Sequence, residues 1–82
     1  MGSFQYVIKD EVGMHARPAG MLVKLAKELS SAVTITKRDR TVEATKLLAI
    51  MSLGVKKGEE ITVSADSEED LEKLKKFFEE NL

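Results

Sequence analysis

The chain has 82 residues, no cysteine and 43% hydrophobic residues, so it can form one small domain with a modest core and no disulfides. Thirteen basic against fourteen acidic side chains leave a net charge of −1, which argues against bulk binding of nucleic acid or anionic membranes. No apolar run approaches the ~20 residues of a membrane span, and no signal peptide is recognisable. We therefore expect a single domain over residues 1–82, cytoplasmic, with neither nucleic acid nor membrane as a partner.

The first half of the chain predicts a strand, a helix and a hairpin. Residues 3–9 alternate apolar and polar side chains, as in a strand with one buried side. Between residue 16 and about residue 29, apolar side chains recur at helical spacing, and Gly20 among them suggests a close approach by another segment. Residues 32–36 and 40–44 alternate again, and the Lys-Arg-Asp between them predicts a tight hairpin whose turn type stays open.

The second half predicts a short helix, a strand and a longer helix. Residues 45–53 hold more apolar side chains than one buried helix stripe can accommodate, so some must face outward, and Gly54 is placed to end this helix. Residues 60–65 alternate as a fourth strand. Ser67, followed by three acids, predicts the start of the last helix. The order βαββαβα indicates an α+β fold with helices on one face of an antiparallel sheet.

The strongest chemical signal surrounds the only histidine and the only proline of the chain. His15 is expected at or beside the N-cap of the first helix, with Pro18 in the first turn, where a missing N–H costs nothing. The free N–H groups of Ala16 and Arg17 then point toward whatever lies beside the imidazole. The Arg17 guanidinium adds forked donors that suit phosphate or carboxylate oxygens. These groups together predict an anion site.

Other interpretations of these residues have to be weighed. A lone histidine near a helix start is more often a simple cap or a solvated side chain, and Arg17 alone would be an ordinary surface arginine. A metal site is not expected, because one histidine and no cysteine cannot supply the usual ligands. A stand-alone enzyme is not expected either, because the motif contains no second titratable group to act as a base, and a short chain leaves little room for a cleft. No cofactor is expected.

Two separate motifs resemble a known family. The first is Gly-Met-His-Ala-Arg-Pro-Ala at residues 13–19, and the second is Leu-Leu-Ala-Ile-Met-Ser-Leu-Gly at residues 47–54, followed by Lys57-Gly58. They closely resemble the histidine-containing phosphocarrier protein HPr of the bacterial sugar phosphotransferase system, and the resemblance covers essentially the whole chain. It implies an open-faced β-sandwich of four antiparallel strands covered on one face by three helices. It also implies that His15 accepts a phosphoryl group from phosphorylated enzyme I and passes it to enzyme II A domains, with Arg17 as its phosphate-binding neighbour.

The short helix carries further expectations. Those of Leu47, Leu48 and Met51 that face outward are expected to form a docking surface, the alternative being an overfilled core. In the family this helix lies close to the histidine and contacts enzyme I and enzymes II. Many Gram-positive members have a regulatory serine just before it, where this chain has Lys46. No regulatory phosphoserine is therefore expected here, nor its partners, the serine kinase/phosphorylase and the catabolite control protein. Thr45 is the candidate helix cap and substitute phosphosite.

Two classes of function are compatible with these residues. The first is a phosphocarrier that is phosphorylated and dephosphorylated at His15, which requires an open site because the transferring oxygens need in-line access. The alternative is a regulatory binding module of the same fold that acts by forming a complex with a transcription factor or an enzyme. A monomer is expected in either case.

Overall fold

The computed structural model describes residues 2–82 and contains one antiparallel sheet with the strand order β1-β4-β2-β3. Its strands are β1 (Gly2–Val7), β2 (Thr34–Lys37), β3 (Arg40–Glu43) and β4 (Glu60–Ala65). Its helices are α1 (Ala16–Glu28), α2 (Leu47–Ser52) and α3 (Glu68–Asn81). The predicted α+β class and the order βαββαβα are confirmed.

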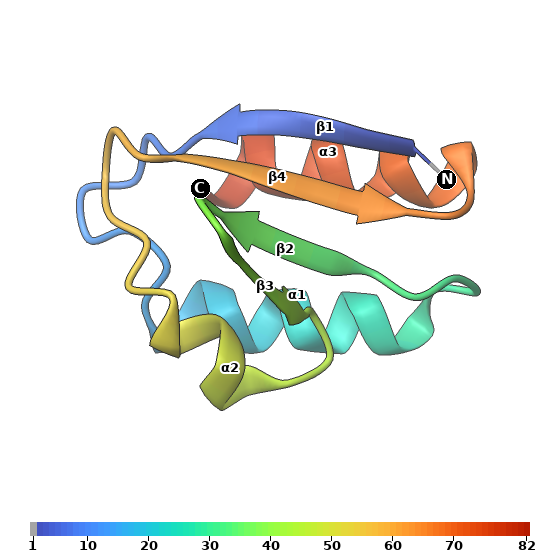
Figure 1. Cartoon of the computed structure of the whole chain (residues 1–82), viewed down its shortest axis with the longest axis horizontal. Coiled ribbons are helices and arrows are strands. Elements are labelled where there is room, and N and C mark those ends of the chain that lie inside the picture. The colour runs from blue at the N-terminus through green and yellow to red at the C-terminus, as the bar shows by residue number, and fades with distance from the viewer. Residues whose placement is uncertain (1) are drawn as a thin grey trace.

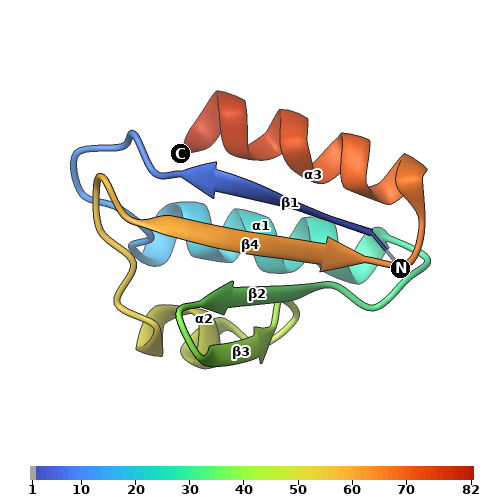
Figure 2. The same ribbon diagram turned by 45° about the horizontal axis from the view of Figure 1, so that its top comes forward.

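All three helices lie on the same side of the sheet (Figure 1). Helix α3 packs on β1 and β4, whereas the short α2 packs on β3 and α1, an arrangement that can be followed in the turned view (Figure 2). The opposite face has no helix over it and carries mostly the polar members of the alternating strands, with Val7 exposed among them. The predicted open-faced β-sandwich is therefore confirmed. None of the helices formed by residues 2–82 is long and apolar enough to cross a bilayer.

The core lies between the sheet and the helices. Strand alternation directs Ile35 of β2 and Val63 of β4 inward, where both are fully buried together with Leu22 of α1. Phe78 of α3 is also fully buried, and the Tyr6 ring of β1 meets it edge-on at 5.5 Å. Edge-to-face contacts of this kind add to the hydrophobic stabilisation, so they hold α3 firmly against the edge strand β1.

Local signals at the ends of the helices are mostly confirmed. Ser67 caps α3, since its hydroxyl accepts a hydrogen bond from the Asp70 N–H at 3.3 Å. Gly54 follows α2 with a φ of 60°, in the left-handed region that glycine tolerates. The expectation that Thr45 caps α2 is wrong: the first intrahelical bond of α2 runs from the Ile50 N–H to the Lys46 carbonyl at 3.0 Å, so Lys46 is the N-cap, and its side chain makes no capping bond.

Two other expectations need correction. The β2–β3 turn contains only Arg38 and Asp39, because Lys37 still pairs with Arg40, and Arg38 takes up a left-handed φ of 57°. Gly20 does not serve a close approach, because a Cβ added there would have no neighbouring atom within 4 Å.

Candidate functional site

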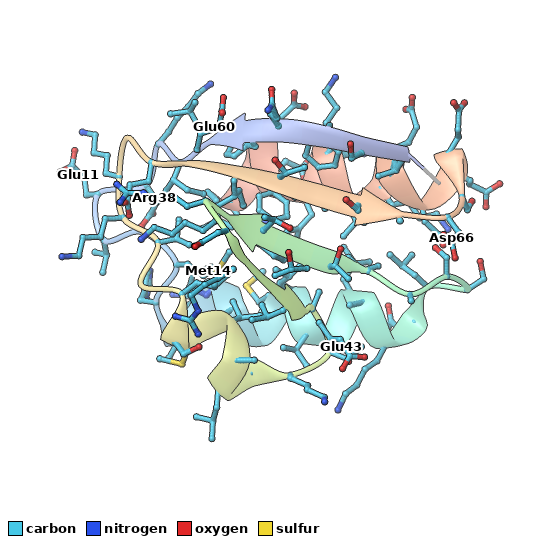
Figure 3. All side chains as sticks on the ribbon, in the orientation of Figure 1. Glu11, Met14, Arg38, Glu43, Glu60 and Asp66 are labelled. Atoms are coloured by element: carbon cyan, nitrogen blue, oxygen red, sulfur yellow. The ribbon has the colours of Figure 1, made fainter. Side chains whose placement is uncertain are left out.

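The loop between β1 and α1 holds His15 at the beginning of the helix. Gly13 has a φ of 82°, and a Cβ there would overlap the carbonyl oxygen of Val55. The N–H of Met14 donates to that same oxygen at 2.9 Å, which ties the loop to the segment that leads into β4. This end of the molecule also carries Glu11 and Arg38 and lies opposite Asp66 (Figure 3). Because position 13 has a positive φ and no room for a Cβ, the backbone path requires a glycine there.

His15 is the N-cap of α1, as expected. Its carbonyl accepts the first intrahelical bond from Ala19 at 3.0 Å, while its imidazole makes no capping bond and its side chain is 39% exposed. Within residues 2–82, the N–H groups of Ala16 and Arg17 have no hydrogen-bond acceptor. The structure thus places a partly exposed imidazole beside two unpaired donors at the positive end of a helix.

A shallow, solvent-open hollow lies beside the imidazole and is lined by Asp10, His15, Arg17, Pro18, Met21 and Asn81. Arg17 is exposed and Pro18 is buried in the first turn of α1. The hollow therefore brings the imidazole and the guanidinium to one place, as the spacing predicted. An anion placed there can meet both side chains and the helix N-terminus.

Asp10 is a functional candidate that sequence analysis missed. Its Oδ2 lies 3.6 Å from His15 Nε2 and accepts hydrogen bonds from the N–H groups of Val12 and Gly13, at 3.0 and 3.1 Å. The histidine motif itself contains no second titratable group, but the loop folds one against the imidazole. The available signal was an aspartate three residues before a glycine, an arrangement in which the carboxylate readily accepts turn amides.

The apolar residues of α2 divide between the core and the surface. Ile50 is fully buried, whereas Leu47, Leu48 and Met51 are 38%, 81% and 38% exposed. All three candidate docking residues therefore face solvent, and an overfilled core does not account for them. Met21 of α1 is 44% exposed and also lines the hollow of His15. We call Leu47, Leu48, Met51 and Met21 the apolar surface.

Basic side chains of the β2–β3 hairpin hold the carboxyl end of α2. Lys37 Nζ donates to the carbonyls of Leu53 and Gly54 at 3.0 and 3.1 Å, and the Arg40 guanidinium donates to the carbonyl of Ser52 at 3.1 Å. Cations at this end of a helix also complement its dipole. Lys46, at the other end, forms an exposed ion pair with Glu43 at 3.0 Å. The orientation of α2 is thus set by the hairpin beside it.

No group of three or more histidine, cysteine or acidic side chains in the part of the chain that the structure describes is arranged to hold a metal ion. The polar groups at the hollow are the His15 imidazole, the Arg17 guanidinium, the Asp10 carboxylate, the Asn81 amide and the backbone amides at the start of α1.

The family described as "PTS HPr component phosphorylation site" has a sequence model that matches residues 3–80. The chain belongs to the HPr family. The phosphocarrier protein HPr of Mycoplasma capricolum subsp. capricolum is 39% identical over 66 residues, which are 80% of this chain and 74% of that protein. The chain is thus a phosphocarrier of the phosphotransferase system rather than a stand-alone catalyst, and the resemblance to HPr is confirmed.

Solved HPr structures share the fold. A Mycoplasma histidine-containing phosphocarrier protein superposes with a TM-score of 0.87 and 33% identity, over 93% of this chain and 90% of that one. HPr from Bacillus anthracis gives a TM-score of 0.84 and 27% identity, over 95% and 93%. The catabolite repression protein Crh of Bacillus subtilis, described as a swapped dimer, gives 0.75 and 33% over 100% and 98%.

Proposed function

We propose that His15 is the residue that carries the phosphoryl group, accepting it from phosphorylated enzyme I and passing it to the A domains of enzymes II. The observation that supports this role is the partly exposed imidazole beside the unpaired N–H groups of Ala16 and Arg17. A bound phosphoryl group carries close to two negative charges, and these amides, the helix dipole and the Arg17 guanidinium all attract it.

The two imidazole nitrogens have different surroundings, which favours Nδ1 as the nucleophile. Nε2 faces the Asp10 carboxylate at 3.6 Å, so a proton on Nε2 points toward a negative charge. The lone pair of Nδ1 is then free to form a bond to phosphorus while the bond from phosphorus to the donor breaks.

A carrier must release its group as readily as it accepts it. A site that bound the phosphorylated state tightly would stop the transfer, so near balance between donor and acceptor is required. The exposed fraction of 39% at His15 is consistent with this requirement, since it leaves room for in-line approach of a partner's reacting group. The apolar surface, which adjoins the hollow through Met21, is the proposed docking site for these partners.

The decisive experiment is incubation with enzyme I and phosphoenolpyruvate. The wild type should gain an acid-labile phosphate, and His15→Ala should gain none. Because the imidazole makes no capping bond, this substitution should leave α1 intact, which circular dichroism checks. A wild type that takes no label contradicts the proposal. Labelling without onward transfer to any enzyme II A domain favours the regulatory binding module instead.

Two finer expectations belong to this proposal. Lys46 cannot be phosphorylated on oxygen, so regulation through a serine at this position, with its kinase and the catabolite control protein, should not occur. We also expect the carrier to act as a monomer, although Crh and an HPr from Thermoanaerobacter tengcongensis are described as dimers. Light scattering at micromolar concentration distinguishes the two states, and a dimer would contradict this expectation.

A further inference from the structure

We propose that Asp10 is a positioning residue that, acting through the His15 imidazole, keeps the phosphoryl group ready to leave. This inference rests on the proposed role of His15. Asp10 lies outside the histidine motif of residues 13–19, and only the fold brings it to the imidazole.

The carboxylate of Asp10 is held in place from two sides. Its Oδ2 accepts the N–H groups of Val12 and Gly13, and its own backbone N–H donates to the carbonyl of Leu82 at 2.8 Å. Neutral amides fix the oxygen without cancelling its charge. The result is a fixed negative charge 3.6 Å from Nε2, on the side of the ring away from Nδ1.

This negative charge affects phospho-His15 in two ways, and both favour release of the phosphoryl group. The imidazole is a better leaving group when Nε2 carries a proton, and a neighbouring carboxylate favours that proton. The carboxylate also repels the negative charges of the phosphoryl oxygens. Both effects destabilise the phosphorylated form relative to the free form and therefore promote release.

The hydrolysis of phospho-His15 can be written atom by atom for the form that carries a proton on Nε2. A water oxygen bonds to phosphorus, the N–P bond breaks, and its electron pair returns to Nδ1. The proton on Nε2 stays where it is, so the products are neutral imidazole and dihydrogen phosphate. Transfer to a partner's nucleophile follows the same course, with that nucleophile in place of water.

Arg17 and Asp10 are the charged side chains that line the hollow, and they oppose each other. The Arg17 guanidinium and the helix amides retain the phosphoryl group, whereas the Asp10 carboxylate favours its departure. The pair thus supplies the near balance that a carrier requires.

The test is the lifetime of phospho-His15 in Asp10→Asn. The amide oxygen of asparagine can still accept the N–H groups of the loop, so the substitution removes the charge and preserves the turn. Both proteins are phosphorylated with phosphoramidate, which needs no docking partner, and loss of the group is followed by phosphorus NMR at one neutral pH. The variant should keep its phosphoryl group at least about threefold longer. Asp39→Asn, at the exposed β2–β3 turn, makes the same charge change and should match the wild type.

The outcomes separate the two proposals. If the wild type takes no phosphoryl group on His15, the proposed function is overturned and the role of Asp10 with it. If the wild type is labelled but Asp10→Asn does not lengthen the lifetime, only the role of Asp10 is overturned. A loosened loop would move the amides and Arg17 away from the group and shorten its lifetime, so local unfolding cannot imitate the expected result. Should the asparagine variant fold poorly, Asp10→Ser, whose hydroxyl can also accept a turn amide, takes its place.

Discussion

The carboxylate of Asp70 accepts a 2.6 Å hydrogen bond from the hydroxyl of Ser31 and so joins the start of α3 to the end of α1. The same oxygen accepts the Ser31 N–H at 3.1 Å and the Ser30 hydroxyl at 3.2 Å. The hydroxyl of Ser31, followed by its N–H and the Ser30 hydroxyl, holds the pKa of Asp70 below its usual value even though burial opposes this. Asp70 is 3% exposed, so this link lies beneath the surface.

Asp70→Asn should lower the unfolding temperature by several degrees at neutral pH, and acid should abolish the difference. A carboxyl whose pKa is lowered in the folded state stabilises the fold above the unfolded value, here 3.8, and this contribution is lost as the pH falls through the folded value. The difference in unfolding temperature between the wild type and Asp70→Asn should therefore narrow below about pH 4. Thermal unfolding across pH measures it, with Asp66→Asn as the exposed control. A gap that persists at low pH would contradict the prediction.

Gly13→Ala should destabilise the fold by about 2 kcal/mol or more, because the residue needs a positive φ and its new Cβ would overlap the Val55 backbone. Gly20→Ala makes the same chemical change where nothing lies within 4 Å, inside α1. It should raise stability by up to ~1 kcal/mol. Urea unfolding of both variants provides the comparison, and equal effects would show that the loop tolerates a side chain.

Leu48→Ser should weaken binding to enzyme I by about tenfold while changing stability by less than about 0.5 kcal/mol. Leu48 is 81% exposed, so little of it supports the core. The readout is the KM for phosphorylation of this protein by enzyme I. Val7→Thr removes an apolar surface from the uncovered face of the sheet, where Val7 is 45% exposed, and should leave this KM unchanged. If enzyme I docks elsewhere on the surface, Leu48→Ser and Val7→Thr should give similar KM values.

Lys37→Met should raise the pKa of Glu59 part of the way to its usual 4.5. That pKa is held low first by the Lys56 N–H, which donates to Glu59 at 2.7 Å, and next by the Lys37 ammonium at 3.1 Å. Carboxyl carbon NMR gives the titration. Lys56→Met is the matched control, since Lys56 acts through its backbone N–H, and it should leave the pKa unchanged. If the pKa of Glu59 is the same in Lys37→Met as in the wild type, Lys37 does not lower it.

The same substitution, Lys37→Met, should also lower the local stability of α2. The variant loses the two bonds to the Leu53 and Gly54 carbonyls, so the carboxyl end of α2 should fray. Amide exchange in α2 should quicken in this variant and remain slow in Lys56→Met.

Much of this protein could be predicted from local sequence signals. The period-2 alternation of residues 60–65 predicted β4 to the residue, and Ser67 was recognised as a helix cap from the acids that follow it. His15 at the start of α1 follows from its spacing to Pro18 and the apolar stripe beyond. These features depend on neighbours within one or two helical turns, which is why the linear order of residues was sufficient.

The features that a linear pattern did not reveal depend on how loops turn, on which side of a short helix faces outward and on where distant segments meet. Asp70 was expected only to complement a helix dipole, yet the packing of α3 beside the end of α1 buries its carboxylate. Likewise, a turn of the loop brings Asp10 to His15, and the path of the hairpin brings Lys37 to α2. The six residues of α2 are too few for periodicity to decide which side chains face outward. The sequence by itself determined the elements and the candidate phosphoryl carrier, whereas tertiary packing decided which charges surround it, because charges interact through space and not along the chain.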